Sequence, residues 1–272
     1  YARPTHEFFG YSSGLDFETK ILVKPNAAKL LEKKFQSRTW VPQVIAFSGN
    51  TDCYQPVEKR LKLTRKCLDV FLKFRNPVAI ITKNATILRD LDILQELAKR
   101  DLVTVTISVT TLNNVLCRKM EPRTSAPLKR LEALERLTSA GIPTSVNVAP
   151  VIPGLTDHEM PAILQEASRR GVKNAAYILL RLPHAVKELF LSWMARHYPN
   201  RTQKVEHFVQ ATRAGQLNDP CFGSRQRGEG ARADAIERLF KMSCRKYGLN
   251  LERFTPSTGH FRRRTKRQGE LF

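Results

Sequence analysis

Short apolar runs alternate with longer amphipathic segments between residues 41 and 180. The runs that predict strands are VIAFS (44–48), VAIIT (78–82), VTVTISV (103–109), TSVNVAPVI (144–152) and NAAYILL (174–180). The segments between them that predict helices are 56–75, 87–100, 124–140 and 157–170. Buried strands that are separated by helices indicate parallel βα units. The pattern therefore predicts an α/β protein with a parallel sheet.

The segment 124–140 illustrates the helical pattern. One apolar face runs along it, made of four leucines spaced three residues apart: Leu128, Leu131, Leu134 and Leu137. Pro127 near the start and Gly141 after the end are typical helix boundaries. In the preceding helix, Cys67 falls at helical spacing with Phe71 and Phe74, which predicts that its thiol packs in the core.

An open doubly wound sheet and a full or partial TIM-type barrel both fit this pattern. In both folds, ligands bind at the carboxyl ends of the strands. The predicted strand ends share small or polar residues: Ser48-Gly49-Asn50-Thr51-Asp52, Thr82-Lys83-Asn84, Ser108-Val109-Thr110-Thr111, Asn147-Val148-Ala149-Pro150 and Leu180-Arg181. Loops are generally polar, which explains Asn84 equally well. A cation directly after an apolar strand, as at Lys83, is less expected.

The chemistry of these strand ends suits a zwitterionic ligand. Thr51 and Asp52 can accept hydrogen bonds from an ammonium group, while Lys83 and Ser108 can donate to a carboxylate. The backbone of Ala149 can read the edge of an adenine ring. Together they fit an amino acid joined to a nucleoside, although a sugar phosphate held by Lys83 fits as well.

The charge is strongly basic and uneven. The chain carries a net charge of +21 with a pI near 10.2. Residues 191–272 contain 17 Lys and Arg against 7 Asp and Glu, and they end in HFRRRTKRQGELF. Such an excess favours DNA or another polyanion, which we expect the basic C-terminal region to hold near the barrel mouth. The alternatives are a basic surface that binds nothing, or a non-catalytic nucleic-acid-binding protein on a barrel scaffold.

The cysteines do not form a recognisable framework. The five stand at 53, 67, 117, 221 and 244, an odd number at wide spacing, and no pair has the spacing of a metal site. We therefore assign no metal ligand within the chain and expect a reducing, cytoplasmic environment. No apolar run approaches the roughly 20 residues of a membrane span.

Five motifs occur in order, each at a strand end or in the loop that follows. They are SGNTDCYQPVEK, ITKN, TISVTT, RKMEPRT and VNVAPVIPGLTDHE. This series resembles the radical S-adenosylmethionine (SAM) superfamily, and within it the spore photoproduct lyase-like enzymes, over residues 1 to about 190. The resemblance implies a partial TIM-type (β/α)6 barrel over residues 1–184 and a basic helical region over 185–272. It also implies a radical SAM enzyme that generates a 5′-deoxyadenosyl radical for hydrogen abstraction, with nucleic acid as an expected substrate.

The resemblance also assigns cofactors. It implies SAM and a [4Fe–4S] cluster, which that family holds with a C-x-x-x-C-x-x-C loop. The opening YARPTH resembles the residues after the third cysteine of that loop. We therefore expect the cluster ligands and the first strand to lie upstream of residue 1, and these 272 residues alone to be inactive.

Six positions match functional residues of the family. Thr51 and Asp52 match positions that hold the SAM amino group, and Lys83 and Ser108 match those that hold its carboxylate. Ala149 matches the position that reads the adenine. Tyr1 matches an aromatic residue near the cluster that is implicated in hydrogen-atom relay, and we predict a catalytic role for it.

One departure concerns the thiol that donates a hydrogen atom in photoproduct lyase. Aligned on the Thr51-Asp52 pair, that position is Gly49 here. Cys53 is then either a displaced catalytic donor or a thiol that caps the next helix. In the 118–124 segment, Glu121 and Arg123 are predicted to form a loop ion pair, to touch substrate, or to lie in a solvated loop.

Overall fold

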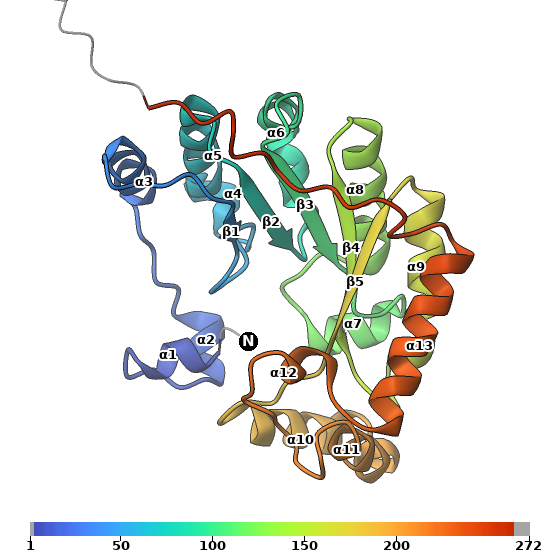
Figure 1. Ribbon diagram of the computed structural model, residues 1–272. Helices are drawn as coiled ribbons and strands as arrows, with labels where there is room; N and C mark the ends of the chain where they lie inside the picture. The colour runs from blue at the N-terminus through green and yellow to red at the C-terminus, as the bar shows by residue number, and fades with distance from the viewer. Residues whose placement is uncertain (1–2, 264–272) are drawn as a thin grey trace, which may run out of the picture.

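A five-stranded parallel sheet forms the centre of the molecule (Figure 1). The structure is a computed structural model that describes residues 3–263. The strands are β1 (Ile45–Phe47), β2 (Val78–Thr82), β3 (Val103–Ser108), β4 (Thr144–Val151) and β5 (Asn174–Leu179). They pair in sequential order, each parallel to the next. Because this order never reverses, the sheet winds in one direction as in a partial TIM-type barrel, and the predicted α/β fold is confirmed.

One layer of helices covers the outer face of the sheet. It contains α5 (Leu63–Phe74), α6 (Leu91–Ala98), α8 (Pro127–Ser139) and α9 (Met160–Arg169), with α3 (Ala27–Gln36) packed on α5. Helix α13 (Ala231–Lys246) packs beside α9, and its Phe240 ring lies 4.8 Å from that of Tyr177 on β5. The last long helix therefore belongs to the barrel layer rather than to an appendage.

Several predicted helices are divided into shorter pieces. Segment 56–75 contains α4 (Glu58–Leu61) and α5, which separate at Lys62, where φ is 52°. Segment 87–100 corresponds to η1 (Ala85–Asp90) followed by α6, and segment 157–170 to η2 (Asp157–Glu159) followed by α9. A further helix, α7 (Asn114–Met120), begins where the Asn113 side chain accepts hydrogen bonds from the Val115 and Leu116 amides.

The two faces of the sheet differ in composition. Alternate strand residues such as Ile80, Val105 and Val146 are fully buried against the helices, and they form the main core. The other face is lined by small or polar residues and one isoleucine: Ala46, Ala79, Ile81, Thr104, Thr106, Ser145, Asn147 and Ala176. Ile81 is 40% exposed there. The strands are therefore not buried equally on both faces, which is the arrangement of a barrel wall with a polar interior.

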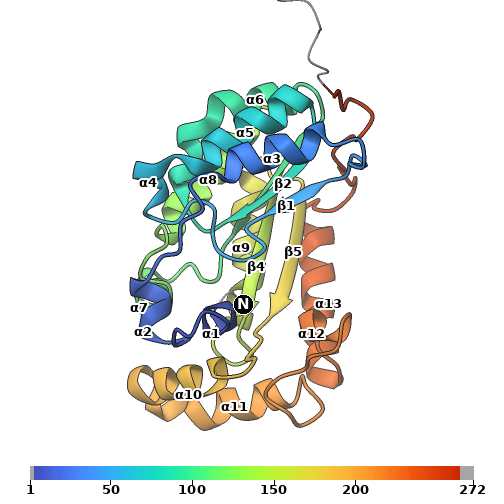
Figure 2. The same cartoon turned by 90° about the vertical axis from the view of Figure 1, so that its left-hand side faces the viewer.

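Two groups of helices lie at the C-terminal edge of the sheet, toward which the strand arrows point (Figures 1 and 2). One is α1 (Pro4–Glu7) and α2 (Leu15–Thr19). The other is α10 (Val186–His197), η3 (Pro199–Arg201), α11 (Thr202–Gln210) and α12 (Ser224–Arg227). They are tied to the α7 loop because Trp193 Nε1 donates to Lys119 O at 3.0 Å and Arg123 donates to Glu18 O.

The C-terminal segment crosses the opposite edge. Residues 250–263 run past the N-terminal ends of the strands, drawn in red in Figure 1. Their backbone amides donate to loop carbonyls there: Asn250 N to Lys173 O at 2.8 Å, Ser257 N to Asp101 O at 2.7 Å and Arg262 N to Phe74 O at 2.9 Å. We refer to residues 250–263 as the strap.

The strap corrects the expected place of the basic tail. Arg262 and Arg263 lie on it at the N-terminal edge, with Arg263 donating to Trp40 O at 3.0 Å. They are therefore remote from the barrel mouth, where a tail-bound polyanion was expected. The other basic residues of the tail, Arg264, Lys266 and Arg267, lie outside the described residues. No helix within residues 3–263 combines the length and the apolar character needed to cross a bilayer.

Candidate functional site

The predicted binding residues meet at the C-terminal edge of β2, β3 and β4. Lys83 follows β2, Ser108 ends β3 and Ala149 lies near the end of β4. Asp52, in the loop after β1, reaches the same place, because its Oδ2 accepts a hydrogen bond from Lys83 N at 2.8 Å. The fold therefore brings together four residues that span 98 positions of the sequence.

The Asp52 carboxylate already holds protein groups. Its Oδ1 accepts from Thr82 Oγ1 at 2.7 Å and from Tyr54 N at 2.8 Å, in addition to the Lys83 amide bonded to Oδ2. These bonds fix the β1 loop to the end of β2. A carboxylate has about four lone-pair sites, so Asp52 retains the capacity to accept from one ligand group. Thr51 precedes it in the loop and is half-buried.

The ammonium group of Lys83 joins a buried charge network. Lys83 Nζ forms an ion pair with Glu121 Oε1, and Glu121 Oε2 accepts from Arg130 Nη2 at 2.7 Å. The side chain of Lys83 is 25% exposed, whereas those of Glu121 and Arg130 are 9% and 1% exposed. Two cations and one anion leave one positive charge, and Lys83 is the member that reaches the surface.

The titration of Glu121 reflects this network. Burial alone opposes ionisation of its carboxyl group, but the charges of Lys83 and Arg130 outweigh burial and lower the pKa of Glu121 to about 2. The carboxylate is thus ionised throughout the neutral range. It does not form the predicted loop ion pair with Arg123, because Arg123 donates to the Glu18 backbone instead.

The same network fixes the neighbouring strand ends. Arg130 Nη1 donates to Ser108 O at 3.0 Å, and Thr110 Oγ1 lies 2.8 Å from Ala149 O and 3.0 Å from Glu121 Oε1. The regular pairing of β4 with β5 is interrupted between Val148 and Val151, around Ala149. The positions predicted to hold a carboxylate and an adenine are therefore linked through one set of buried side chains.

The inner face offers an additional acceptor. Asn147 pairs with Ser108 in the sheet register and is 6% exposed, yet its Oδ1 has no hydrogen-bond partner in the described structure. A buried polar atom without a partner is costly unless a ligand completes it. Small neighbours such as Ala79 and Ala176 leave room beside it. Together with Lys83, these features fit a ligand such as SAM, which carries a carboxylate and hydrogen-bond donors.

The predicted catalytic residues are not both placed at this site. Tyr1 lies outside the described residues. Cys53 packs against the hydrophobic core, and its backbone amide donates to Ser48 Oγ at 3.0 Å. Burial, reinforced by the charge of Asp52, raises the pKa of the Cys53 thiol well above its usual range. This environment favours a packing role for Cys53 over that of a displaced hydrogen donor.

The described residues do not fit an iron–sulfur cluster. Cys67, Cys117 and Cys244 are buried apart from one another and Cys221 is exposed. No group of three or more His, Cys, Asp or Glu side chains within residues 3–263 is arranged to hold a metal ion. Cys67 is 5% exposed among the core residues of α5, which confirms its predicted packing.

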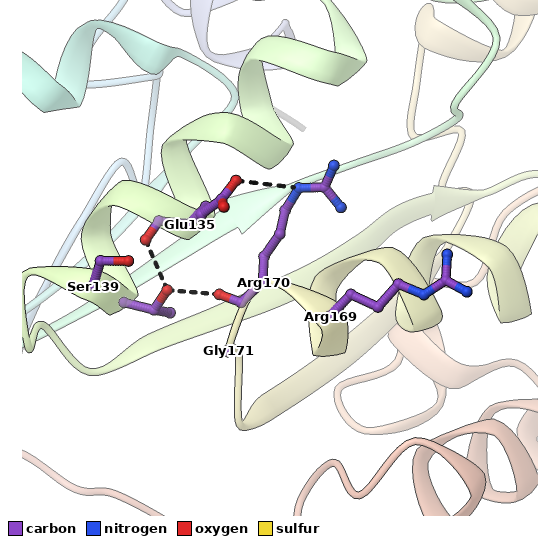
Figure 3. Close-up of a pocket in the computed structure, with 6 residues that line it drawn as sticks. Glu135, Ser139, Arg169, Arg170 and Gly171 are labelled. Carbon is purple, nitrogen blue, oxygen red and sulfur yellow. Dashed lines mark hydrogen bonds and ion pairs between the residues drawn. The ribbon is translucent and has the colours of Figure 1, made fainter.

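A cavity at the N-terminal edge provides a contrast. It measures about 350 Å³ and is lined by Glu135, Thr138, Ser139, Arg169, Arg170 and Gly171, at the C-terminal ends of α8 and α9 (Figure 3). Its arginines are paired: Arg170 Nη1 lies 2.5 Å from Glu166 Oε2, and Arg169 Nη1 lies 2.9 Å from Glu166 Oε1. The charges of this cavity are therefore already satisfied by the protein, and it lies away from Lys83.

Sequence reasoning missed three members of the site. Arg130 lies on the predicted helix 124–140, where a charged residue normally indicates a solvated face. Thr110 and Asn147 were noted at strand ends but were assigned no role. The signal for Asn147 was available, because an amide within an apolar strand requires a partner. Neither the burial of Arg130 nor its pairing with Glu121 follows from local pattern.

Comparisons with known proteins agree on one family. The profile of the Radical SAM superfamily matches residues 15–167. An uncharacterized protein of Mycobacterium tuberculosis is 30% identical over 224 residues, which cover 82% of this chain and 65% of the relative. An uncharacterized protein of Methanocaldococcus jannaschii is 30% identical over 159 residues, covering 58% of this chain and 57% of the relative. The chain thus spans about two thirds or less of these relatives.

Solved structures of spore photoproduct lyase are similar in fold. A double mutant with bound AdoMet and dinucleoside spore photoproduct aligns with a TM-score of 0.63 at 15% identity, covering 92% of this chain and 70% of that chain. The complex with dinucleoside spore photoproduct aligns with a TM-score of 0.62 at 16% identity over the same shares. At such identities the likeness shows the fold alone.

Proposed function

The chain belongs to the radical SAM superfamily, and from this we propose that it binds SAM at the C-terminal edge of its sheet and abstracts a hydrogen atom from an anionic substrate. The superfamily uses SAM together with a [4Fe–4S] cluster, and when bound these cofactors supply the radical chemistry. The described residues of this chain contribute the cofactor-binding edge and its electrostatics. They do not contribute cluster ligands.

The observation that carries the proposal is the network of Lys83, Glu121 and Arg130. Its net charge is positive and reaches the surface at Lys83, which suits one ligand carboxylate. Glu121 holds the ammonium group in place before a ligand arrives, so less conformational entropy is lost on binding. Ala149 and Asn147 lie on the neighbouring strand, where they can contact the nucleoside portion.

Nucleic acid is the substrate class that the charge supports. A net charge of +21 attracts polyanions, and the lyase structures above contain a dinucleoside lesion. We do not extend the proposal to the lyase reaction itself. Gly49 offers no thiol at the position of the lyase donor, and Cys53 packs against the core. The proposed activity is therefore hydrogen abstraction with a product that differs from simple lesion reversal.

The test is SAM binding by the Lys83→Ala variant. Loss of a charge-assisted hydrogen bond, worth roughly 1.5–3 kcal/mol, should lower the affinity for SAM about tenfold or more by isothermal titration calorimetry. Lys99→Ala is the matched control, because Lys99 forms an exposed ion pair with Glu96 on α6. Equal affinities of wild type and Lys83→Ala would show that Lys83 does not hold the cofactor.

A further inference from the structure

Three buried polar atoms without hydrogen-bond partners occur where β5 ends. Among the described residues, six buried side-chain nitrogen or oxygen atoms lack such a partner, and Arg181 Nε, Arg213 Nε and Asn218 Oδ1 are three of them. Arg181 follows β5 by two residues, and Arg213 Nη2 donates to the adjacent Leu180 O at 2.9 Å. Unpartnered buried donors destabilise a fold. Their concentration at one strand end indicates a ligand that supplies the missing acceptors.

A cavity opens beside these atoms. It measures about 270 Å³, and its lining includes Arg213, Asn218 and Ser224 in the loop that connects α11 to α13. Arg213 is 4% exposed, and its Nη1 donates to Ser224 O at 3.2 Å. The arginine thus ties this loop to the end of β5. The Asn218 amide can rotate to present its nitrogen, a donor, to a ligand.

The charges around the cavity favour an anion. Arg181, Arg213 and Arg225 face Asp219 and Glu229, which leaves one positive charge. Asp219 is engaged elsewhere, since its carboxylate accepts from Cys221 N at 2.7 Å and from Ser224 Oγ at 2.6 Å.

Neither Arg181 nor Arg213 has a carboxylate within ion-pair distance in the described structure. Burial, followed by the charge of Arg225, lowers the pKa of Arg181, as expected for a guanidinium group with too few counter-charges.

An exposed aromatic ring lies next to the cavity. Phe222 is 91% exposed and stands between Cys221, which lines the cavity, and Gly223. The guanidinium carbon of Arg225 lies 5.1 Å from the centroid of its ring. An exposed ring beside a basic pocket is the arrangement on which nucleic-acid bases stack.

We propose that this cavity binds one phosphate group of a single-stranded nucleic acid, with Arg181 and Arg213 donating to its oxygens and Phe222 stacking on a neighbouring base. Planar guanidinium groups match the geometry of phosphate oxygens. The choice of nucleic acid rests on the proposed function, and β5 presents the cavity at the same edge of the sheet as Lys83. The site would hold the substrate strand at the mouth of the barrel, beside the cofactor.

Binding of inorganic phosphate and of a DNA dinucleotide to the intact chain tests this proposal. Arg181→Gln removes an unpaired charge and should lower the affinity for both probes about tenfold by calorimetry. Phe222→Ala should weaken the dinucleotide about fivefold or more and leave phosphate unchanged. Arg169→Gln, in the paired cavity of the N-terminal edge, is the control. Thermal unfolding checks that each variant is folded.

Each alternative outcome is decisive. Unchanged affinities in Arg181→Gln, or equal binding of the dinucleotide and its uncharged methylphosphonate analogue, would overturn the phosphate site. A loss for phosphate without any effect of Phe222→Ala would overturn the assignment to nucleic acid and leave a site for a free anion. SAM affinity should be unchanged in Arg181→Gln. If Lys83→Ala leaves SAM binding intact while Arg181→Gln weakens the dinucleotide, the proposed function fails and this site stands.

Discussion

At the N-terminal edge of the sheet, charged side chains pair near the surface, whereas at the C-terminal edge they are buried. Arg169 at the N-terminal edge is 64% exposed and bonds to Glu166 three residues earlier in the same helix. Arg130 is 1% exposed and bonds to Glu121, Ser125 and Ser108 in three different segments. The first arrangement is that of an ordinary helix surface. The second costs desolvation and is retained where the position of a charge matters.

The backbone differs between the two edges in the same way. The strap covers the N-terminal edge with amide-to-carbonyl bonds that complete the loops. The C-terminal edge instead leaves Asn147, Arg181 and Arg213 with unpartnered atoms. The structure is therefore completed by its own chain at one edge and open to ligands at the other, which agrees with the rule that parallel βα folds bind ligands at the C-terminal ends of their strands.

The largest expected difference between the edges is in stability. Arg130→Met should lower the free energy of unfolding by about 3–5 kcal/mol, because Glu121 loses its buried partner and three oxygen acceptors lose a donor. Arg169→Met, the matched change at the other edge, should cost at most about 1 kcal/mol. Urea denaturation measures both values. Similar costs for the two variants would contradict the contrast.

The next largest effect is on pH dependence. The pKa of Glu121 is about 2 in the fold, below its ordinary value of 4.5, so its stabilising contribution is present above pH 4.5 and is lost as the pH falls toward 2. The difference in unfolding free energy between wild type and Glu121→Gln should therefore shrink by up to about 3 kcal/mol over that range. Denaturation at a series of pH values measures it. A difference that is constant with pH would show that Glu121 carries no buried charge.

The strands were predictable because their signal is local. Runs such as VAIIT combine β-branched residues with helices before and after, and β2 coincides with the prediction at 78–82. The pairing of Lys83 with Glu121 joins residues 38 positions apart, and the intervening pattern carries no information on it. The resemblance in sequence located Lys83, Ser108 and Ala149 at strand ends. It did not indicate what holds them.

Helix α8 shows why the remainder was missed. Its apolar face predicted four buried leucines, and Leu131, Leu134 and Leu137 are at most 4% exposed. Leu128 is 58% exposed, while Arg130 is buried, because the first turn of the helix lies over the charge network rather than over the core. Periodicity reports the helix as a whole and cannot distinguish a turn that faces a polar site.

The smallest expected effect concerns the strap. Replacing Arg262 and Arg263 together by Gln should leave SAM affinity unchanged, because both lie at the N-terminal edge. If the basic C-terminal region binds duplex DNA, the slope of log affinity against log salt should flatten by about 0.9 for each phosphate that these arginines neutralise in the wild type. Fluorescence anisotropy across a salt series measures the slope. A fall in SAM affinity would mean that the two edges are not separate.

The central claim is that Lys83, held by Glu121, binds the carboxylate of SAM. It is tested most directly by titrating SAM and decarboxylated SAM into wild type and Lys83→Ala by calorimetry, as a double-mutant cycle between one side chain and one ligand group. Wild type should prefer SAM about tenfold or more, and Lys83→Ala should bind the two ligands equally. If Lys83→Ala keeps the preference of the wild type, the carboxylate is bound elsewhere and the central claim is wrong.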